Sequence, residues 1–170
     1  VSIVMPTTLS GATTAKCLAS VLERSSYENF EVLIVAQREH AITARDNLDF
    51  ARLLTHSRVR IVEYEQTPFN FSRVCNLGAR SARGDLICFL NDDVEVLTED
   101  WLERLVARAS LADVGAVGPM LYYPSNVIQH AGVVLAGADV AEHAFKRCRR
   151  GEPGYFGRAG LEQDYSCVTA

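Results

Sequence analysis

Short apolar runs alternate along this chain with longer segments whose apolar residues recur at helical spacing, and this alternation limits the fold more than any other feature. The strand-like runs lie at residues 1–6, 31–36, 58–64 and 85–90. The helix-like segments lie at residues 14–22, 41–55, 70–82 and 98–109. Strands that alternate with helices favour a mainly parallel sheet with helices on both faces, so the sequence predicts an α/β fold. A capping threonine, Thr13 or Thr14, is expected at the start of the first helix.

The last third of the chain has a weaker pattern. Two further strands are predicted at 114–119 and 127–135, and the glycine-rich, basic stretch 146–160 is typical of a long loop. This stretch contains a cluster of basic residues, Lys146, Arg147, Arg149 and Arg150. The cluster fits two interpretations, a mobile lid that contacts phosphates and a solvated surface. A length of 170 residues fits one domain, so we expect a single domain over residues 1–170.

Charge, hydropathy and cysteine spacing exclude several classes of protein. The net charge of −4 lacks the basic excess of nucleic-acid-binding proteins, so we expect no nucleic-acid partner. No run of these 170 residues approaches the roughly 18 apolar residues of a membrane span, and none of them has the pattern expected of a signal peptide. The five cysteines form no CxxC pair, which favours reduced thiols in a cytoplasmic protein. Because the chain begins at Val1 directly on a strand-like run, we expect it to be a piece of a longer protein.

A pair of adjacent carboxylates lies directly after the fourth apolar run, where FLNDDVEV contains Asn91, Asp92 and Asp93. Open parallel sheets bind ligands beyond the carboxyl ends of their strands, so this position suits a binding site. Adjacent carboxylates repel each other unless they are solvated, hydrogen-bonded or bound to a cation. A divalent ion such as Mg²⁺ prefers one or two carboxylates together with phosphate oxygens of a substrate. Two interpretations stay open from these residues alone, a metal site and an ordinary turn before the next helix.

A resemblance to family 2 glycosyltransferases runs over nearly the whole chain. It rests on motifs that occur in the family's order, namely VSIVMPT, EVLIV, GDLICFLNDDVEV, TEDWLERLV and VGAVGPMLYYP. The chain is most similar to rhamnosyltransferase-like members from bacterial surface-polysaccharide assembly, as indicated by PFNFSRVCN, IQHAGVVL and PGYFGRAGLEQDYSCVTA. Each motif is loose by itself, but the set is specific.

This resemblance implies a Rossmann-like, A-type glycosyltransferase fold and an enzyme that transfers a sugar with inversion. The implied donor is a nucleotide-diphosphate sugar, and the implied acceptor is a saccharide or a lipid-linked molecule. The acceptor hydroxyl attacks the anomeric carbon, a general base takes its proton, and a divalent metal, Mg²⁺ or Mn²⁺, stabilises the leaving diphosphate. A non-catalytic nucleotide-sugar-binding or scaffolding module is the alternative that stays open.

The resemblance also implies roles for particular residues. The triplet Asn91-Asp92-Asp93 falls on the family's Asp-x-Asp-type motif, which makes Asp93 the expected metal ligand and Asp92 a contact for ribose or donor sugar. Two other segments match nucleotide-binding regions of the family: Pro6, Thr7 and Thr8 in the loop that closes over the base, and Asn70, Arg73 and Asn76 beside the nucleotide. From the residues alone, Asn70 also suits a helix N-cap and Arg73 a solvated helix position.

The chain departs from the family pattern in two places. Many members carry an acid after the second strand, where this chain has Ala36-Gln37-Arg38, so the nucleotide base stays open. The family's general base lies downstream of a strand that would begin near Val168. We therefore predict that the base lies beyond Ala170 and that the isolated chain is inactive. The resemblance further implies a cytoplasmic location at the inner face of the membrane, with any membrane association through regions outside this chain.

The IQHAG stretch offers a further candidate, His130, with Gln129 and Gly132 beside it. A histidine in an apolar strand is more often a core residue than a ligand. Both interpretations are kept for His130, and for His143 further along the chain.

Overall fold

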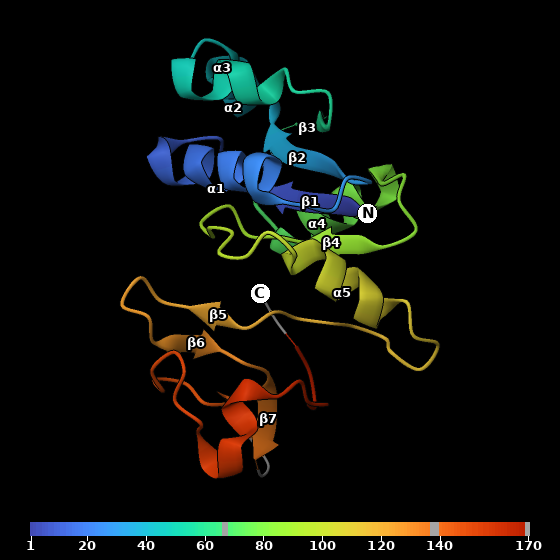
Figure 1. Cartoon of the computed structure of the whole chain (residues 1–170). Helices are drawn as coiled ribbons and strands as arrows, with labels where there is room; N and C mark the ends of the chain where they lie inside the picture. Colours follow the sequence, from blue (N-terminus) through green and yellow to red (C-terminus); the bar gives the residue numbers. More distant parts are fainter. Residues whose placement is uncertain (66–67, 137–139, 169–170) are drawn as a thin grey trace. The chain divides into compact units, whose positions relative to one another are not determined.

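The structure is a computed structural model that describes residues 1–65, 68–136 and 140–168. The chain divides into two compact units, Val1–Arg104 and Leu105–Ala170, which are considered separately below (Figure 1). The single-domain organisation over 1–170 stays a prediction. No helix in the described ranges is long and apolar enough to cross a membrane.

The first unit is built around a parallel sheet. In its described residues, the sheet has the strand order β3-β2-β1-β4. The strands are β1 (Ser2–Pro6), β2 (Glu31–Gln37), β3 (Val59–Tyr64) and β4 (Ile87–Phe89), and all of their pairings are parallel. These are the four predicted strands in their predicted order along the chain. The fourth is shorter than expected and lies at the edge of the sheet.

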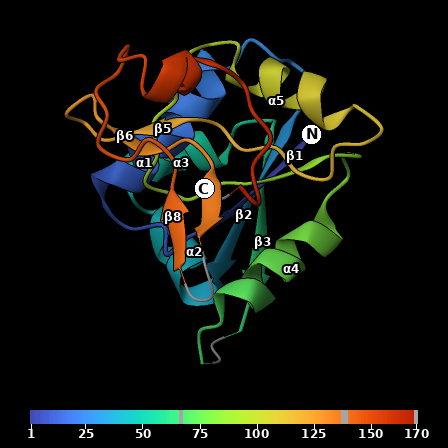
Figure 2. The same ribbon diagram turned by 90° about the horizontal axis from the view of Figure 1, so that it is seen from below.

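Helices cover both faces of this sheet, as the sequence predicts. They are α1 (Gly11–Arg24), α2 (Arg38–Arg45), α3 (Leu48–Leu54) and α4 (Phe71–Ser81). A further helix, α5 (Trp101–Ala109), begins at the end of this unit and continues into the second. Figure 2 shows α4 on one side of β1–β3 and α1–α3 on the other. Because side chains alternate along a strand, Val4, Leu33 and Val35 face α4, where they pack with Val74. The alternate residues of β1 and β2 point to the opposite face and are fully buried; they are Ile3, Met5, Val32, Ile34 and Ala36.

One local prediction for this unit is wrong. The helix expected at 41–55 is two helices, because the first ends at Arg45 with Asp46 as its C-cap, and Asn47 caps the second, its side chain accepting a hydrogen bond from the Asp49 N–H (2.9 Å). Beyond the end of α4, a Cβ at Gly84 would lie 2.8 Å from the Val1 carbonyl carbon, so glycine is required for the close approach to the start of β1.

Glu31 forms hydrogen bonds with three residues at the amino-terminal edge of the sheet. Its carboxylate accepts hydrogen bonds from Ser2 Oγ (2.8 Å), the Arg83 N–H (2.9 Å) and Arg60 Nη2 (3.0 Å). Burial by itself would raise the pKa of the Glu31 carboxyl, but these hydrogen bonds and the Arg60 charge outweigh burial and lower the pKa below its ordinary value. The ionised form of Glu31 therefore stabilises the folded unit.

Replacing Glu31 with glutamine should lower the free energy of unfolding at neutral pH, and the difference from wild type should shrink in acid. A carboxyl whose pKa is lowered by folding contributes stability above its unfolded pKa of about 4.3, and that stability is lost as the pH falls through the folded pKa. Urea unfolding at about pH 7 and about pH 3 measures the difference. Glu23→Gln, at an exposed position of α1, is the matched control. A difference that is the same at both pH values would contradict this role of Glu31.

The second unit contains two antiparallel strand pairs in its described residues. β5 (Leu121–Tyr122) pairs with β6 (Ile128–His130), and β7 (Val133–Ala136) pairs with β8 (Val140–His143). A 3-10 helix, η1 (Tyr155–Gly160), follows. The strand predicted at 114–119 does not form, since these residues pair with no strand in the described part of the chain. The strand predicted at 127–135 is β6 and β7, because Gly132 turns the chain between them with a φ of +104°.

The basic stretch that the sequence predicts as a long loop is ordered in its first part. The Arg147 N–H donates to the Ile128 carbonyl (2.9 Å), the Ile128 N–H to the Cys148 carbonyl (2.8 Å), and the Arg150 N–H to the Asn126 carbonyl (2.8 Å). Residues 147–150 therefore run beside β6 as a strand-like segment. This arrangement favours a solvated surface over a mobile lid.

Candidate functional site

The carboxyl ends of β1 and β4 lie next to each other at the point where the strand order reverses. From β1 the chain moves to β2 and β3 on one side, and it then returns to place β4 on the other side. Open α/β sheets bind ligands in the crevice formed at such a switch point. The loops that leave β1 and β4 begin at Thr7 and Leu90, so they carry five of the predicted site residues, Thr7, Thr8, Asn91, Asp92 and Asp93.

Asp92 joins these two loops. Its Oδ2 accepts hydrogen bonds from Thr7 Oγ1 (2.6 Å) and from Thr14 Oγ1 (3.0 Å). Thr7 follows β1 directly, whereas the buried Thr14 lies one turn inside α1. One carboxylate oxygen therefore holds the β1 loop, the start of α1 and the β4 loop together, and we call this arrangement the Asp92 clamp.

Thr14 is a site residue whose role the sequence did not reveal. Its pattern suggested a helix cap, but α1 begins earlier, at Gly11, with Ser10 as the N-cap residue. Thr14 Oγ1 contacts the Ser10 carbonyl (3.2 Å) as well as Asp92. Thr14 and Asp92 are 78 positions apart, so no local signal links the two residues.

A buried thiol, that of Cys17, contacts the backbone of the loop that follows β4. Cys17 Sγ lies 3.6 Å from the Asn91 carbonyl oxygen, to which it donates. Burial raises the pKa of the Cys17 thiol to about 11; a backbone hydrogen bond at Val94 opposes this change, and the charges of Asp92 and Asp93 add to it. The thiol therefore keeps its proton at neutral pH and remains a hydrogen-bond donor.

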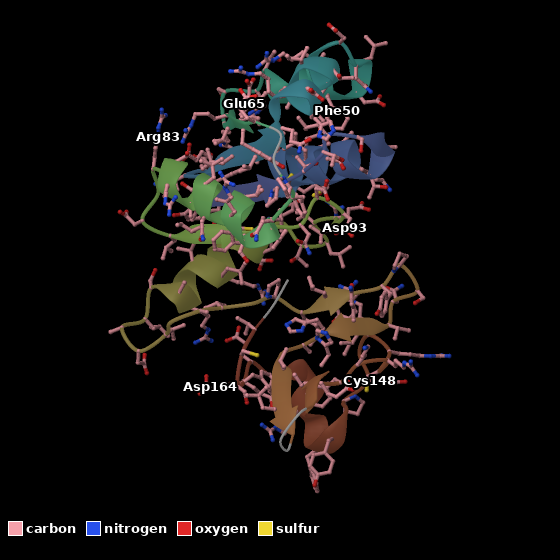
Figure 3. The ribbon with its side chains drawn as sticks, turned by 180° about the vertical axis from the view of Figure 1, so that it is seen from behind. Phe50, Glu65, Arg83, Asp93, Cys148 and Asp164 are labelled. Atoms are coloured by element: carbon pink, nitrogen blue, oxygen red, sulfur yellow. The ribbon has the colours of Figure 1, made fainter. Side chains whose placement is uncertain are left out.

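Asp93 differs sharply from its neighbour. Its side chain is exposed, and it forms no hydrogen bond or ion pair with any described residue. Figure 3 shows Asp93 on the loop that follows β4. Asn91 is half-buried, and its backbone carbonyl is the acceptor for Cys17. Of the two adjacent carboxylates, one is therefore engaged within the protein and the other is available to a ligand.

The predicted residues of the β1 loop lie beside the clamp. Pro6 ends β1 opposite Val35, whose carbonyl accepts the Thr7 N–H (3.1 Å). Thr7 Oγ1 also accepts the N–H of the buried Leu9 (2.9 Å), which has a φ of +51°. Thr8 is exposed and its hydroxyl shares a hydrogen bond with Ser10 Oγ (2.7 Å). The backbone here is fixed, and Thr8 is the member of this loop that faces solvent.

The other predicted segment lies at the start of α4. Asn70 is the N-cap, because its Oδ1 accepts the Arg73 N–H (2.9 Å). Arg73 and Asn76 are exposed on the helix. Since α4 follows β3 and returns toward the start of β4, its first turn lies at the same edge of the sheet as the carboxyl ends of the parallel strands. The structure places this segment at the carboxyl-terminal edge of the sheet, and the side-chain oxygen of Asn70 is already engaged as a helix cap.

The position after β2, where the chain lacks the family's acid, belongs to an ion-pair cluster. Arg38 pairs with Glu63 (3.3 Å) and Glu65 (3.0 Å), and Arg45 pairs with the same Glu63 (2.8 Å). Acidic residues are therefore present near the end of β2, but they belong to β3 (Glu63) and to the residue after it (Glu65). Their sequence positions gave no signal of this proximity.

His130 in the second unit is a core residue. It is 1% exposed, its Nε2 accepts the Gly132 N–H (3.2 Å), and its Nδ1 lies 2.7 Å from His143 Nδ1. An accepting Nε2 places the proton of neutral His130 on Nδ1, which then donates to His143. Burial, and then the nearby His143, lower the pKa of His130. The structure thus supports the core interpretation, while Gln129 is exposed.

Comparison with known proteins gives the family. The model of the family described as "Glycosyl transferase family 2" matches residues 2–151. The chain belongs to glycosyltransferase family 2. Among its relatives, the uncharacterized protein y4gI of Sinorhizobium fredii is 39% identical over 172 residues, which cover 100% of this chain and 18% of that protein. The O-antigen biosynthesis protein RfbC of Myxococcus xanthus is 34% identical over 152 residues, or 89% of this chain and 12% of that protein. This glycosyltransferase chain thus spans less than a fifth of the length of either relative.

A solved structure confirms the predicted A-type glycosyltransferase fold. The mannosyltransferase PcManGT from Pyrobaculum calidifontis, determined in complex with GDP-Man and Mn²⁺, is similar with a TM-score of 0.56. The two chains are 19% identical, and the match covers 72% of this family 2 chain and 35% of the other. At this identity the likeness concerns the fold alone.

Proposed function

We propose that this chain is the donor-binding part of an inverting, metal-dependent glycosyltransferase. The enzyme would move a sugar from a nucleotide-diphosphate sugar to a saccharide or lipid-linked acceptor in cell-surface polysaccharide synthesis. The observation that carries the proposal is the exposed Asp93 beside the clamped Asp92, at the switch point of a parallel sheet. Family membership and the similarity to an O-antigen biosynthesis protein support the reaction class and the process.

The residues at this point fit a divalent cation that is shared with a substrate. In the described residues, no group of three or more His, Cys, Asp and Glu side chains could hold a metal ion. Mg²⁺ and similar hard cations commonly bind one or two protein carboxylates and complete their shell with substrate phosphates and water. Asp93 would supply the carboxylate, as an exposed side chain without a protein partner in the described ranges. When bound, such an ion neutralises negative charge on a departing diphosphate.

The other predicted residues would position the donor. The β1 loop, with Pro6, Thr7 and Thr8, would lie against the nucleotide base, and its backbone is already fixed by the Asp92 clamp. Asn91 would face the ribose or the donor sugar, as would the second oxygen of Asp92, Oδ1. At the start of α4, the guanidinium of Arg73 could donate charge-assisted hydrogen bonds to a phosphate. Asn70 would act indirectly by fixing the start of that helix, and Asn76, about one turn beyond Arg73, would lie beside the nucleotide.

The acceptor hydroxyl would attack opposite the diphosphate, and the general base that takes its proton stays a prediction beyond Ala170. Free thiols at all five cysteines accord with the proposed cytoplasmic location, at the inner face of the membrane. The nucleotide base stays open, because the chain lacks the family's acid after β2.

Calorimetric titration of the 170-residue chain tests donor binding. GDP, UDP and dTDP should be titrated in the presence of Mn²⁺, of Mg²⁺ and of a chelator. We expect at least one diphosphate to bind more than about tenfold more tightly with metal than with chelator, a difference of about 1.4 kcal/mol. The matching nucleoside monophosphate is the control, because it lacks the second phosphate. Equal binding with and without metal, or no binding of any diphosphate, would overturn the proposal.

A further inference from the structure

The second unit displays a dense line of positive charge on an ordered backbone. Four of the five residues from Lys146 to Arg150 are basic. The hydrogen bonds of residues 147–150 to β6 hold this segment, with Val127 and Arg149 paired as an antiparallel bridge. Lys146, Arg147, Arg149 and Arg150 are all exposed. The charges are therefore held at the edge of a small sheet, and we call residues 146–150 the basic edge.

The charges of the basic edge are not neutralised within the described part of the chain. Lys146, Arg147 and Arg149 form no ion pair with a described acidic side chain. The nearby Glu152 carboxylate accepts the backbone N–H of Arg149 (2.9 Å) and not its guanidinium. The guanidinium of Arg150 lies over the Tyr122 ring, 5.2 Å from its centroid. The chain as a whole carries a net charge of −4, so any attraction of an anion to this edge is local.

Two exposed aromatic rings follow the basic edge. Tyr155 and Phe156 are 71% and 84% exposed, and their rings contact each other edge to face. Phe156 is in the left-handed region, with a φ of +51°. Gly154 packs closely against Phe145, the residue before the basic edge, because a Cβ at Gly154 would lie 2.8 Å from the Phe145 ring. Basic and aromatic residues thus belong to one packed stretch of chain.

We propose that residues 145–160 bind the surface of an anionic phospholipid bilayer. Cations spread along an open edge suit many dispersed headgroup phosphates, whereas a single phosphate is bound best where several donors converge. Clustered Lys and Arg side chains bind anionic leaflets, and exposed aromatic rings insert at the headgroup level. The proposal assigns membrane contact to this chain itself and does not depend on the proposed donor site.

Sedimentation of the full chain with lipid vesicles tests this proposal. We expect binding to vesicles of phosphatidylcholine mixed with phosphatidylglycerol, little binding to phosphatidylcholine alone, and a decrease as salt is added. Each Lys or Arg near such a surface contributes about fivefold in partitioning, so Arg147→Ala with Arg149→Ala should lower the partition coefficient roughly 25-fold. Replacing Tyr155 and Phe156 with serine should weaken binding further.

A matched control is available in the first unit. Arg52→Ala with Arg80→Ala removes the same charge from exposed positions of α3 and α4, and it should leave vesicle binding almost unchanged. Near-ultraviolet circular dichroism should match wild type in both double variants, since backbone hydrogen bonds hold the basic edge. Equal losses in the two variants, equal binding to neutral vesicles, or complete displacement by soluble pyrophosphate would each overturn the proposal. These assays contain no nucleotide or metal, so their failure would leave the donor site unaffected.

Discussion

Asp93→Asn should abolish metal-dependent binding of nucleoside diphosphate while the protein stays fully folded. The Asp93 side chain is exposed and contacts no described partner, so its replacement breaks no interaction of the fold. A neutral amide is a weaker ligand than a carboxylate for a hard cation. Because loss of a residue that only supports a metal ligand typically weakens binding about 10- to 100-fold, loss of the ligand itself should cost at least about 100-fold. Calorimetric titration with Mn²⁺ measures the change.

The same strand provides the control for this experiment. Asp85 is also exposed, but it precedes β4 and so lies at the opposite, amino-terminal edge of the sheet. Asp85→Asn makes the identical change in charge, and it should leave diphosphate binding unaltered. If both variants bind equally well, or if Asp93→Asn retains the metal dependence, Asp93 is not the metal ligand.

Asp92→Ala, unlike Asp93→Asn, should cause a large loss of folding stability. It removes the shared acceptor of Thr7 and Thr14, whose hydroxyls lie 2.6 and 3.0 Å from the same carboxylate oxygen. A hydrogen bond to a charged group contributes about 1.5–3 kcal/mol, and the buried Thr14 hydroxyl would lose one of its two partners. We expect the free energy of unfolding to fall by about 3 kcal/mol in urea denaturation. Donor binding should fall as well, because the loops after β1 and β4 are no longer joined.

A double-mutant cycle isolates the clamp. Thr14→Val removes one donor and should cost about 1–2 kcal/mol by itself. In combination with Asp92→Ala its additional cost should be much smaller, because the interaction is already lost. Strictly additive losses would show that the two residues act independently. An Asp92→Ala protein as stable as wild type would show that the clamp does not stabilise the fold.

Much of the fold could be predicted because it depends on local patterns. A buried strand needs a short apolar run, and a helix packed on a sheet needs apolar residues on one side, so the β and α segments of the first unit are visible in the sequence. Asn70 likewise caps α4 through a contact only three residues away. The errors arose where one residue interrupts a pattern, as Asn47 does between α2 and α3 and Gly132 does between β6 and β7.

The sequence by itself determined the class of fold, the family and the position of an acidic pair at the end of a strand. Only the tertiary structure separated the two acids, by bringing Thr7 and Thr14 to Asp92 and leaving Asp93 exposed. That distinction depends on β4 pairing beside β1, which brings together residues 78 and 85 positions apart. Strand order is decided by how the whole sheet packs against its helices, and the periodicity of a single segment contains no information about it.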